Sequence, residues 1–343
     1  MLEMVSQTAG PSAIESRPRI AVLVRAHFVS EKLVDLLRIL KAGVGYDLRA
    51  CADETQGPLN LPGEVVLRIS TEMCSDLGLL GSVPNSQLLW YFSDYAFYCA
   101  HHCIPDYDYY IMIDWDVEFV RGDAYALESL ISCLNLPEGS PYDLVGTHYG
   151  PQTPDWEWWG TCEGRFKDFY GVFFPLIVLS KRALQYLYDW RKYEAANPLE
   201  SGNYVFGEAF VPSALMAAGG YRCADLNSLL PGSYDFSSFR IPPPMLLGRL
   251  PPLSRGIELV HPVYSEREYL ESELGDARQN NSVAEFMTRL RNPALLPVSP
   301  ALRREFLSRL LEPDVSPVPQ SSPGARKRRP TKAAGGTGRR PTR

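Results

Sequence analysis

Long apolar runs and a secretory signal are both missing from this sequence of 343 residues. No stretch approaches the roughly 20 consecutive apolar residues that a helix needs to cross a bilayer. Residues 1–18 include acidic side chains and lack the apolar core of a signal peptide. We therefore expect a soluble protein that is at most peripheral to a membrane.

Cysteine is scarce and scattered, with seven residues and no regular spacing. This pattern favours reduced thiols and a cytoplasmic location over a disulfide framework. Cys99 and Cys103 have helical spacing, and the neighbouring His101 and His102 raise the question of zinc. No second pair with the spacing of zinc ligands occurs in the sequence. We expect these residues to pack in the core rather than to bind a metal.

Several functional motifs are also missing. The chain has no glycine-rich phosphate loop of the Walker or dinucleotide type, and no Gly-x-Ser-x-Gly turn of a serine hydrolase. Its basic C-terminal segment lacks the interleaved aromatic residues of a nucleic-acid surface, so we expect no specific nucleic-acid partner. These absences exclude the commonest nucleotide-hydrolysing and acyl-transferring classes.

The composition is nevertheless that of a folded protein, with 45% hydrophobic and 11% aromatic residues. The net charge of −6 conceals a basic end, since the segment from Pro313 onward holds eight basic residues against Asp314 alone. That segment is rich in Pro, Ser and Gly and cannot form a core. We expect a disordered leader over 1–18, a main domain over 19–263, a helical extension over 264–312 and a disordered basic tail over 313–343.

Predicted strands and helices alternate along the main domain. Strands are expected over 19–24, 46–52, 64–69, 109–113, 143–147, 173–179 and 257–260, and helices after Ser30, over 86–103, after Ser180 and from about Pro212. Ser265 with Glu268, Ser282 with Glu285, and Ser299 with Pro300 mark three later helix starts. The alternation predicts an α/β fold with a mixed, mostly parallel sheet flanked by helices.

Asp114 and Asp116 follow the most apolar run of the chain, Tyr109 to Ile113. Such a run is typical of a strand buried on both faces, and side chains two apart on a strand share a face. Both carboxylates are then expected at the strand's carboxyl end, where open α/β sheets bind ligands. Because adjacent carboxylates repel each other, the pattern predicts a divalent cation between them. A solvated strand end is the alternative, and the similar triplet at 106–108 is expected to be a turn.

The order of three short motifs resembles that of the GT-A fold glycosyltransferases, the nucleotide-diphospho-sugar transferases. These motifs are the Asp-x-Asp at a strand exit, a Gly-Glu pair at 207–208 and a His-Pro pair at 261–262. The resemblance covers residues 19–263 and identifies no subfamily. It implies that Asp114 and Asp116 hold Mn²⁺ or Mg²⁺ and that His261 completes the metal shell. Oxygen ligands with one imidazole suit these ions, although a hydrogen-bonded histidine beside a proline turn is the alternative.

Asp116 and Glu208 are the predicted catalytic residues. Asp116 would act through the metal that stabilises the departing diphosphate. Glu208 precedes the helix expected from about Pro212, whose positive end should keep its carboxylate ionised. The resemblance implies an acidic base near this point, often in a Glu-Asp pair, but Ala209 stands where the Asp would be. The base and the stereochemistry therefore stay open, and a helix-capping carboxylate is the alternative.

Substrate contacts are predicted at two further places. Half of the chain's six tryptophans fall between residues 156 and 159, and aromatic faces beside carboxylates suit sugar rings. The predicted acceptor site is Asp155, Trp156, Glu157, Trp158 and Trp159, the alternative being a loop packed onto the core. The resemblance places the nucleotide donor near Arg25, His27, Asp53, Asp94 and Asp114.

The predicted function is metal-dependent transfer of a sugar from a UDP- or GDP-linked donor to a hydroxyl group of a glycan or another acceptor. One alternative is a catalytically silent GT-A-like module that binds a glycan or a protein partner. A sugar nucleotidyltransferase is another, but residues 24–27 offer no glycine-rich phosphate loop.

Overall fold

The computed structural model describes residues 17–42, 46–61, 66–81, 88–134, 141–198, 204–241, 243–250 and 256–311. The leader predicted over 1–18, apart from its last two residues, and the basic tail predicted over 313–343 lie outside the described residues. The chain divides into a first unit that ends at Tyr269 and a second unit that begins at Leu270. Among the described residues, no helix combines the length and apolarity that a membrane span requires.

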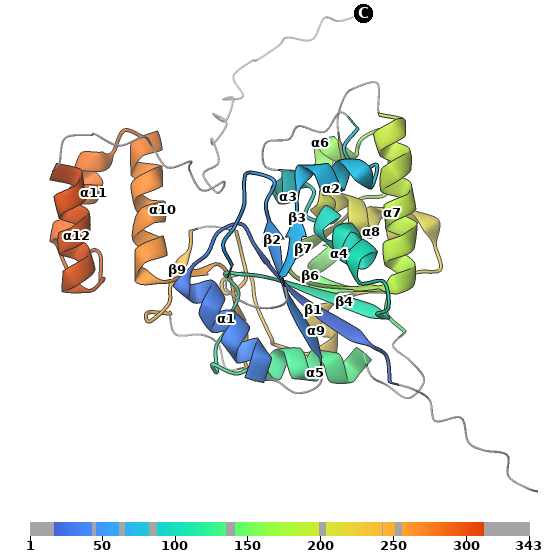
Figure 1. Cartoon of the computed structure of the whole chain (residues 1–343), viewed down its shortest axis with the longest axis horizontal. Coiled ribbons are helices and arrows are strands. Elements are labelled where there is room, and N and C mark those ends of the chain that lie inside the picture. The colour runs from blue at the N-terminus through green and yellow to red at the C-terminus, as the bar shows by residue number, and fades with distance from the viewer. Residues whose placement is uncertain are drawn as a thin grey trace, which may run out of the picture. The chain divides into compact units, whose positions relative to one another are not determined.

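A seven-stranded sheet forms the centre of the first unit (Figure 1). Its strands are β1 (Ile20–Ala26), β2 (Asp47–Asp53), β3 (Val66–Ile69), β4 (Tyr109–Asp114), β6 (Leu144–Pro151), β7 (Tyr170–Ser180) and β8 (Cys223–Asp225). They lie in the order β3-β2-β1-β4-β7-β6-β8, and β7 runs antiparallel to both of its neighbours while the other pairings are parallel. The predicted mixed, mostly parallel sheet is confirmed.

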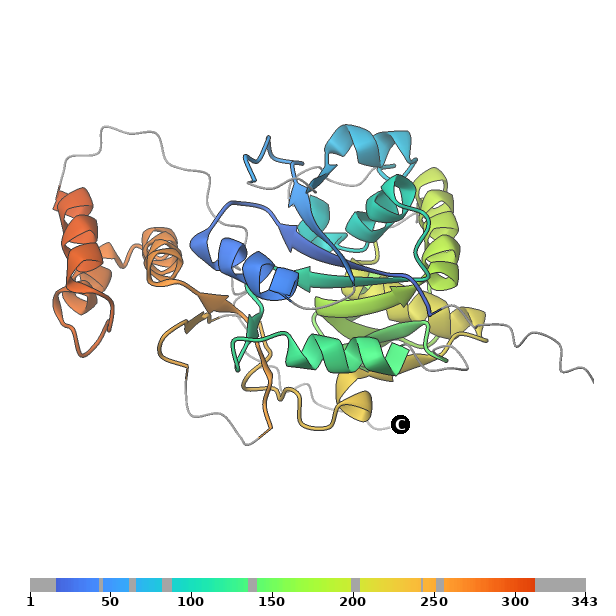
Figure 2. The ribbon, with the colours of Figure 1, turned by 60° about the horizontal axis from the view of Figure 1, so that its bottom comes forward.

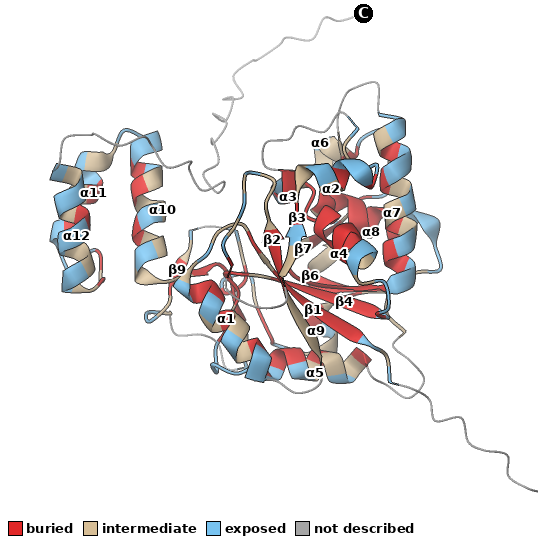
Figure 3. Ribbon diagram, viewed as in Figure 1, coloured by how far each residue is buried: buried red, intermediate tan, exposed pale blue. Residues whose placement is uncertain are grey.

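Helices cover both faces of this sheet, as Figures 1 and 2 show. One face packs against α2 (Thr71–Asp76), α3 (Leu88–Tyr91), α4 (Tyr95–Cys103), α6 (Trp159–Cys162), α7 (Lys181–Ala196) and α8 (Gly207–Ala218). The other packs against α1 (Glu31–Ala42), α5 (Tyr125–Leu134) and α9 (Leu226–Leu229). In β1, Ala21 and Leu23 face the first layer while Val22 and Val24 face the second. This two-sided burial explains why residues 20–24 of β1 and 109–113 of β4 are continuously apolar (Figure 3).

Serine side chains begin two helices where the sequence predicts them. The Ser30 hydroxyl accepts a hydrogen bond from the Leu33 amide at 3.0 Å, and the Ser180 hydroxyl accepts one from Ala183 at 3.2 Å. Each bond satisfies an amide that has no partner inside the helix. The predicted starts of these two helices are therefore confirmed.

Two other helices differ from their predicted bounds. The helix predicted over 86–103 is divided into α3 and α4, with Asp94 just before α4. The helix predicted from about Pro212 begins instead at Gly207, so that Pro212 lies inside α8. A Cβ atom at Gly207 would lie 2.7 Å from the Asp94 carboxylate, so only glycine allows the two helix starts to approach this closely. Tertiary packing decides both boundaries.

The strand predicted over 257–260 does not join the main sheet. Only β10 (Leu259–Val260) forms, and it pairs antiparallel with β5 (Glu118–Phe119). Next along the chain, β11 (Val263–Tyr264) pairs with β9 (Met245–Leu246). The prediction of a last core strand is wrong in this respect, because the segment pairs with the turn after β4 rather than with a sheet edge.

Helices make up most of the described part of the second unit. They are most of α10 (Glu266–Gln279), α11 (Val283–Arg291) and α12 (Pro300–Leu311). Their inner side chains include Leu274, Leu290 and Phe306, each at most 2% exposed. The predicted capping box at the start of α10 is confirmed, since the Ser265 amide donates to Glu268 at 2.8 Å. Ser282 makes no side-chain cap bond, so that prediction is wrong.

Candidate metal and catalytic site

Arg25 and Asp114 lie side by side because their strands are in register. They are partner residues of the parallel pair β1 and β4, near the carboxyl ends of both strands. The Arg25 guanidinium donates from Nε and Nη2 to the two carboxylate oxygens of Asp114, each at 2.8 Å. Its Nη1 also donates to the Leu89 carbonyl at 3.1 Å. This geometry fixes the Asp114 carboxylate by a bidentate, charge-assisted contact.

Asp116 is placed by a turn rather than by the strand. Strand β4 ends at Asp114, and the Val117 amide donates to the Asp114 carbonyl at 3.1 Å to close the turn. The Val263 amide then donates to the Asp116 carbonyl at 2.8 Å. The two acids do meet, but the predicted reason, alternation along one strand, is wrong because the strand stops between them. Asp116 is 8% exposed, so its charge is largely removed from water.

His261 reaches Asp116 through the short β5 and β10 ladder. In that ladder Val260 pairs with Glu118, which places His261 opposite the turn that carries Asp116. The His261 Nε2 atom lies 3.2 Å from Asp116 Oδ1, and its Nδ1–H donates to the Arg240 carbonyl at 2.8 Å. A histidine ligand whose second nitrogen donates to a carbonyl is held in the tautomer that binds metals.

The pKa values of this pair move in opposite directions. Burial alone would lower the pKa of His261, but the charge and hydrogen bond of Asp116 outweigh it and raise that pKa. Burial would likewise raise the pKa of Asp116, yet the contacts with His261 and the nearby His27 lower it. The pair therefore favours a carboxylate beside an imidazole that readily takes up positive charge.

The three side chains fit a divalent ion. One ligand atom each from Asp114, Asp116 and His261 lies within 4.8 Å of the other two. The 3.2 Å between His261 and Asp116 is close to the roughly 3 Å that separates adjacent ligands around an octahedral Mg²⁺. A carboxylate has about four lone-pair positions, so Asp114 can contact Arg25 and still bind an ion. Two carboxylates and an imidazole suit Mn²⁺ or Mg²⁺.

Glu208 lies in the first turn of α8, near Arg25 and Asp114. Its Oε2 accepts a hydrogen bond from the Trp158 indole at 2.9 Å, and its Oε1 accepts one from the Phe174 amide at 3.4 Å. Burial raises the pKa of Glu208 to about 7, although both hydrogen bonds oppose the change. Desolvation thus acts against the ionisation that the helix end was expected to favour, and the ionised state of Glu208 stays a prediction.

His27 and Asp53 lie at the same edge of the sheet. Asp53 lies close enough to act electrostatically on both Arg25 and His27, and His27 also lies near Asp116. Burial lowers the pKa of His27 despite these acids, which favours the neutral imidazole. Asp53 ends β2 and accepts hydrogen bonds from the amide and hydroxyl of Thr55 at 3.0 and 2.6 Å. The structure thus brings both predicted residues to the site, where their contacts with a nucleotide stay predictions.

Asp94 is not available to a nucleotide. It is 0% exposed, and Arg191 donates to its two oxygens at 2.7 and 3.1 Å, while the Tyr98 hydroxyl donates at 3.0 Å. Arg191 is itself 1% exposed and lies 3.6 Å from the centre of the Phe210 ring. We therefore correct the prediction for Asp94, because burial and a full set of partners make it a support for α4, α7 and α8.

The predicted acceptor segment is folded onto the first unit's core. Trp156, Trp158 and Trp159 are each partly buried and pack against the cluster beneath α8. Trp159, for example, lies 4.3 Å from Phe169 between ring centres. This arrangement agrees with the alternative of a packed loop, and stacking of the indoles on an acceptor stays a prediction. Contacts of the exposed Asp155 and Glu157 with an acceptor stay a prediction.

Lys32 was missed by the sequence analysis. Its side chain is 1% exposed, and its Nζ donates to the Val117 carbonyl at 2.7 Å and pairs with Glu118. It therefore holds the turn that carries Asp116. The available signal was its position, since Lys32 falls on the same helix face as Leu36 and Leu40, where an apolar residue is expected.

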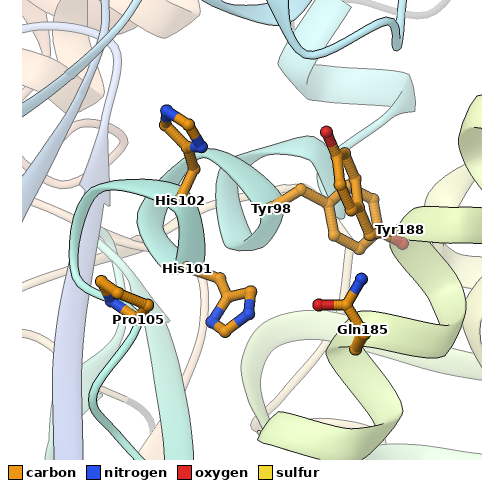
Figure 4. Close-up of a pocket in the computed structure, with 6 residues that line it drawn as sticks. All are labelled: Tyr98, His101, His102, Pro105, Gln185 and Tyr188. Carbon is orange, nitrogen blue, oxygen red and sulfur yellow. The ribbon is translucent and has the colours of Figure 1, made fainter.

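A separate hollow of about 210 Å³ lies between α4 and α7 (Figure 4). It is lined by Tyr98, His101, His102, Pro105, Gln185 and Tyr188. None of the predicted site residues is among these six. The hollow is therefore distinct from the edge of the sheet where the acids gather.

No protein-family model matches the sequence, and no curated protein matches it. Among solved structures, it is similar to a glycosyltransferase involved in glycosylation of the major capsid of PBCV-1, with 13% identity, a TM-score of 0.33, and 60% of this chain and 81% of that chain covered. It is also similar to glucosyl-3-phosphoglycerate synthase from Mycobacterium tuberculosis in complex with Mn²⁺, UDP-glucose and phosphoglyceric acid, with 12% identity, a TM-score of 0.32 and coverage of 61% and 70%.

The mixed sheet, the acidic pair at the end of β4 and the histidine opposite it are all present. In these features the chain has the layout that the resemblance to GT-A fold glycosyltransferases implied.

Proposed function

We propose that this chain is a metal-dependent glycosyltransferase that moves a sugar from a nucleotide-diphosphate donor to a hydroxyl group of an acceptor. The observation that supports it most directly is the cluster of Asp114, Asp116 and His261, whose ligand atoms lie within 4.8 Å of one another. The cluster lies at the carboxyl edge of a mostly parallel sheet, where α/β proteins bind their ligands.

Asp116 and His261 would hold the metal, and Asp114 would share it with Arg25. A bound Mn²⁺ or Mg²⁺ supplies positive charge that stabilises a departing diphosphate. Without such a cation, the edge of the sheet places Asp53, Asp114 and Asp116 around the single guanidinium of Arg25. That excess of negative charge would repel a diphosphate donor. The arrangement therefore makes binding of a UDP- or GDP-linked donor dependent on the metal.

Glu208 is the proposed base. Its pKa of about 7 lies where a general base is most effective at neutral pH, because it is ionised for part of the time and still binds a proton well. It would take the proton from the acceptor hydroxyl as that oxygen attacks the sugar. No second acid follows it at Ala209, so Glu208 would act alone. The exposed Asp155 and Glu157, close in sequence to Trp158, are the proposed acceptor contacts.

The domain limits and the location are also proposals. We assign the transferase domain to residues 19–263 and the helical extension to 264–312. The cytoplasmic location is supported by the seven cysteines, which are all free thiols.

Calorimetric titration with Mn²⁺, UDP and GDP tests the central claim. We expect nucleotide binding only in the presence of the metal, and loss of that binding in Asp116→Ala. Metal-independent binding that survives in Asp116→Ala would contradict the proposal.

The alternative of a silent binding module draws its support from the missing acid after Glu208. Hydrolysis of a sugar donor without acceptor distinguishes the two functions, because a transferase leaks sugar to water whereas a module leaves the donor intact. Slow, Mn²⁺-dependent release of UDP or GDP would support the enzyme. Metal-dependent nucleotide binding with no release, with or without an acceptor panel, would support the module.

A further inference from the structure

We propose that Trp158 is a positioning residue for Glu208: its indole N–H orients the carboxylate and favours its ionised form. The inference rests on the proposed function only in taking Glu208 as the catalytic base. The contact itself is direct, since Trp158 Nε1 lies 2.9 Å from Glu208 Oε2. An indole nitrogen can only donate, so Glu208 must accept.

The direction of that N–H is fixed by other parts of the chain. The Trp158 ring meets Phe206 edge to face, with ring centres 4.9 Å apart at 88°, and meets Tyr91 at 6.2 Å and 87°. Tyr91 and Phe206 stack on each other at 4.5 Å. The three rings come from α3, from the turn before α6 and from the residue before α8. Such T-shaped contacts hold an aromatic ring in one orientation.

Besides the Trp158 bond, the described residues give the Glu208 carboxylate one further hydrogen bond. Its second oxygen accepts this longer bond from the Phe174 amide, at 3.4 Å. The charged groups that act on it are Arg25, which lowers its pKa, and Asp114, which raises it. These two are paired with each other, so their effects on Glu208 partly cancel. The Trp158 bond is therefore the main local interaction that opposes burial and favours the carboxylate over the acid.

This role differs from the one that the sequence suggested for the tryptophans. Instead of stacking on an acceptor, Trp158 would connect the segment at 155–159 to the base. An acceptor that contacts Asp155 or Glu157 would then lie on the same segment that orients Glu208. Trp159 provides a matched comparison, because it belongs to the same segment and its ring packs on Phe169.

The test uses the full chain with ¹⁵N-labelled indoles and needs no donor, acceptor or metal. One of the six indole N–H resonances should shift with pH with a midpoint near 7, the value expected for Glu208. That resonance should stop titrating in Glu208→Gln and should be absent from Trp158→Phe. If no indole resonance responds both to pH and to Glu208→Gln, the proposal is overturned, even if Trp158→Phe fails to fold.

The pH profile of sugar transfer, or of donor hydrolysis, is the second measurement. Trp158→Phe should raise the midpoint of the acidic limb of this profile by roughly one pH unit, because the ionised form of Glu208 loses a hydrogen bond. Trp159→Phe should leave that midpoint unchanged. An unshifted midpoint in Trp158→Phe would overturn the positioning role. A chain without any transferase or hydrolase activity, but with a titrating indole, would refute the proposed function and leave the Trp158 contact standing.

Discussion

The Arg25 guanidinium donates to both carboxylate oxygens of Asp114, at 2.8 Å on each side. The two residues are partners in the parallel pairing of β1 and β4. A protein cation thus already neutralises one member of the acidic pair, while Asp116 is left facing His261 at 3.2 Å. A metal at this edge would join a cation that is part of the fold, and the two would share Asp114.

Replacing Arg25 by methionine should make the chain more dependent on the metal. Asp114 would lose its cation in a mostly buried setting, with an expected cost of about 2 kcal/mol in the free energy of unfolding. Added Mn²⁺ should then raise the melting temperature of Arg25→Met by more than it raises that of the wild type. Arg38→Met, which removes an exposed pair with Asp35, should lose less than about 1 kcal/mol and show the ordinary response to Mn²⁺. Equal metal responses in all three proteins would argue against a shared site.

Asp116→Asn should weaken Mn²⁺ binding by about 100-fold or more, because it removes a charged ligand next to His261. Isothermal titration in the absence of nucleotide measures this directly. The chain supplies its own control in the second Asp-x-Asp triplet, where Asp106 is exposed and precedes β4. Asp106→Asn should leave Mn²⁺ affinity unchanged. A similar loss in both variants would mean that the metal binds by general surface charge.

Glu208 gives the stability of the chain a defined dependence on pH. Folding raises its pKa from 4.5 to about 7, so the folded state binds the proton more tightly than the unfolded state. Its stabilising contribution is complete below about pH 4.5 and is lost as the pH rises through about 7. The difference corresponds to roughly 3 kcal/mol at most.

Urea denaturation between pH 5 and pH 8 checks this sign. As the pH rises, the free energy of unfolding of Glu208→Gln should increase relative to that of the wild type, since glutamine carries no charge to bury. Glu163→Gln, at an exposed position before β7, should follow the wild type at every pH. A wild-type stability that rises relative to Glu208→Gln over this range would contradict the buried, proton-binding state of Glu208.

The ion pair of Asp94 with Arg191 should be critical for folding. Both side chains are at most 1% exposed, and Asp94→Ala would leave a buried guanidinium whose remaining hydrogen bonds, among the described residues, go to Glu194 and the Val205 carbonyl. We expect a loss of about 3–5 kcal/mol in unfolding free energy. Asp35→Ala, in the exposed pair on α1, should cost less than about 1 kcal/mol. Chemical denaturation of both variants gives the comparison, and similar costs would refute the structural role assigned to Asp94.

Gly207→Ala should be harmful despite the usual preference of helices for alanine. The added methyl group would lie 2.7 Å from Asp94 Oδ1 and 2.9 Å from Ser93 Oγ, so α8 must shift together with Glu208. We expect a loss of about 1–3 kcal/mol and a lower rate of sugar transfer. Gly275→Ala, inside α10 where a Cβ meets nothing within 4 Å, should instead stabilise by about 0.5–1 kcal/mol. Thermal melting of both variants measures the contrast, and a stabilised Gly207→Ala would contradict it.

Local sequence patterns determined six of the seven strands of the main sheet, the helix starts after Ser30 and Ser180, and the position of the acidic pair. A continuous apolar run specifies a strand buried on both faces, as in β4, and a serine before an apolar periodic segment specifies a cap, as at Ser30 and Ser180. These features depend on residues a few positions apart, so they can be predicted without knowledge of the fold.

Tertiary structure alone decided how the residues of the candidate site are arranged. Asp94 became a buried support because Arg191, 97 residues away, supplies its counter-charge. His261 reached Asp116 through a ladder that the predicted sheet did not contain, and Glu208 acquired its raised pKa from burial beside Trp158, 50 residues away. Desolvation and ion pairing depend on which distant segments exclude water from a side chain. Periodicity along the chain does not indicate which side chains lose water in this way. The sequence therefore located the acids, while the fold set their charge states and partners.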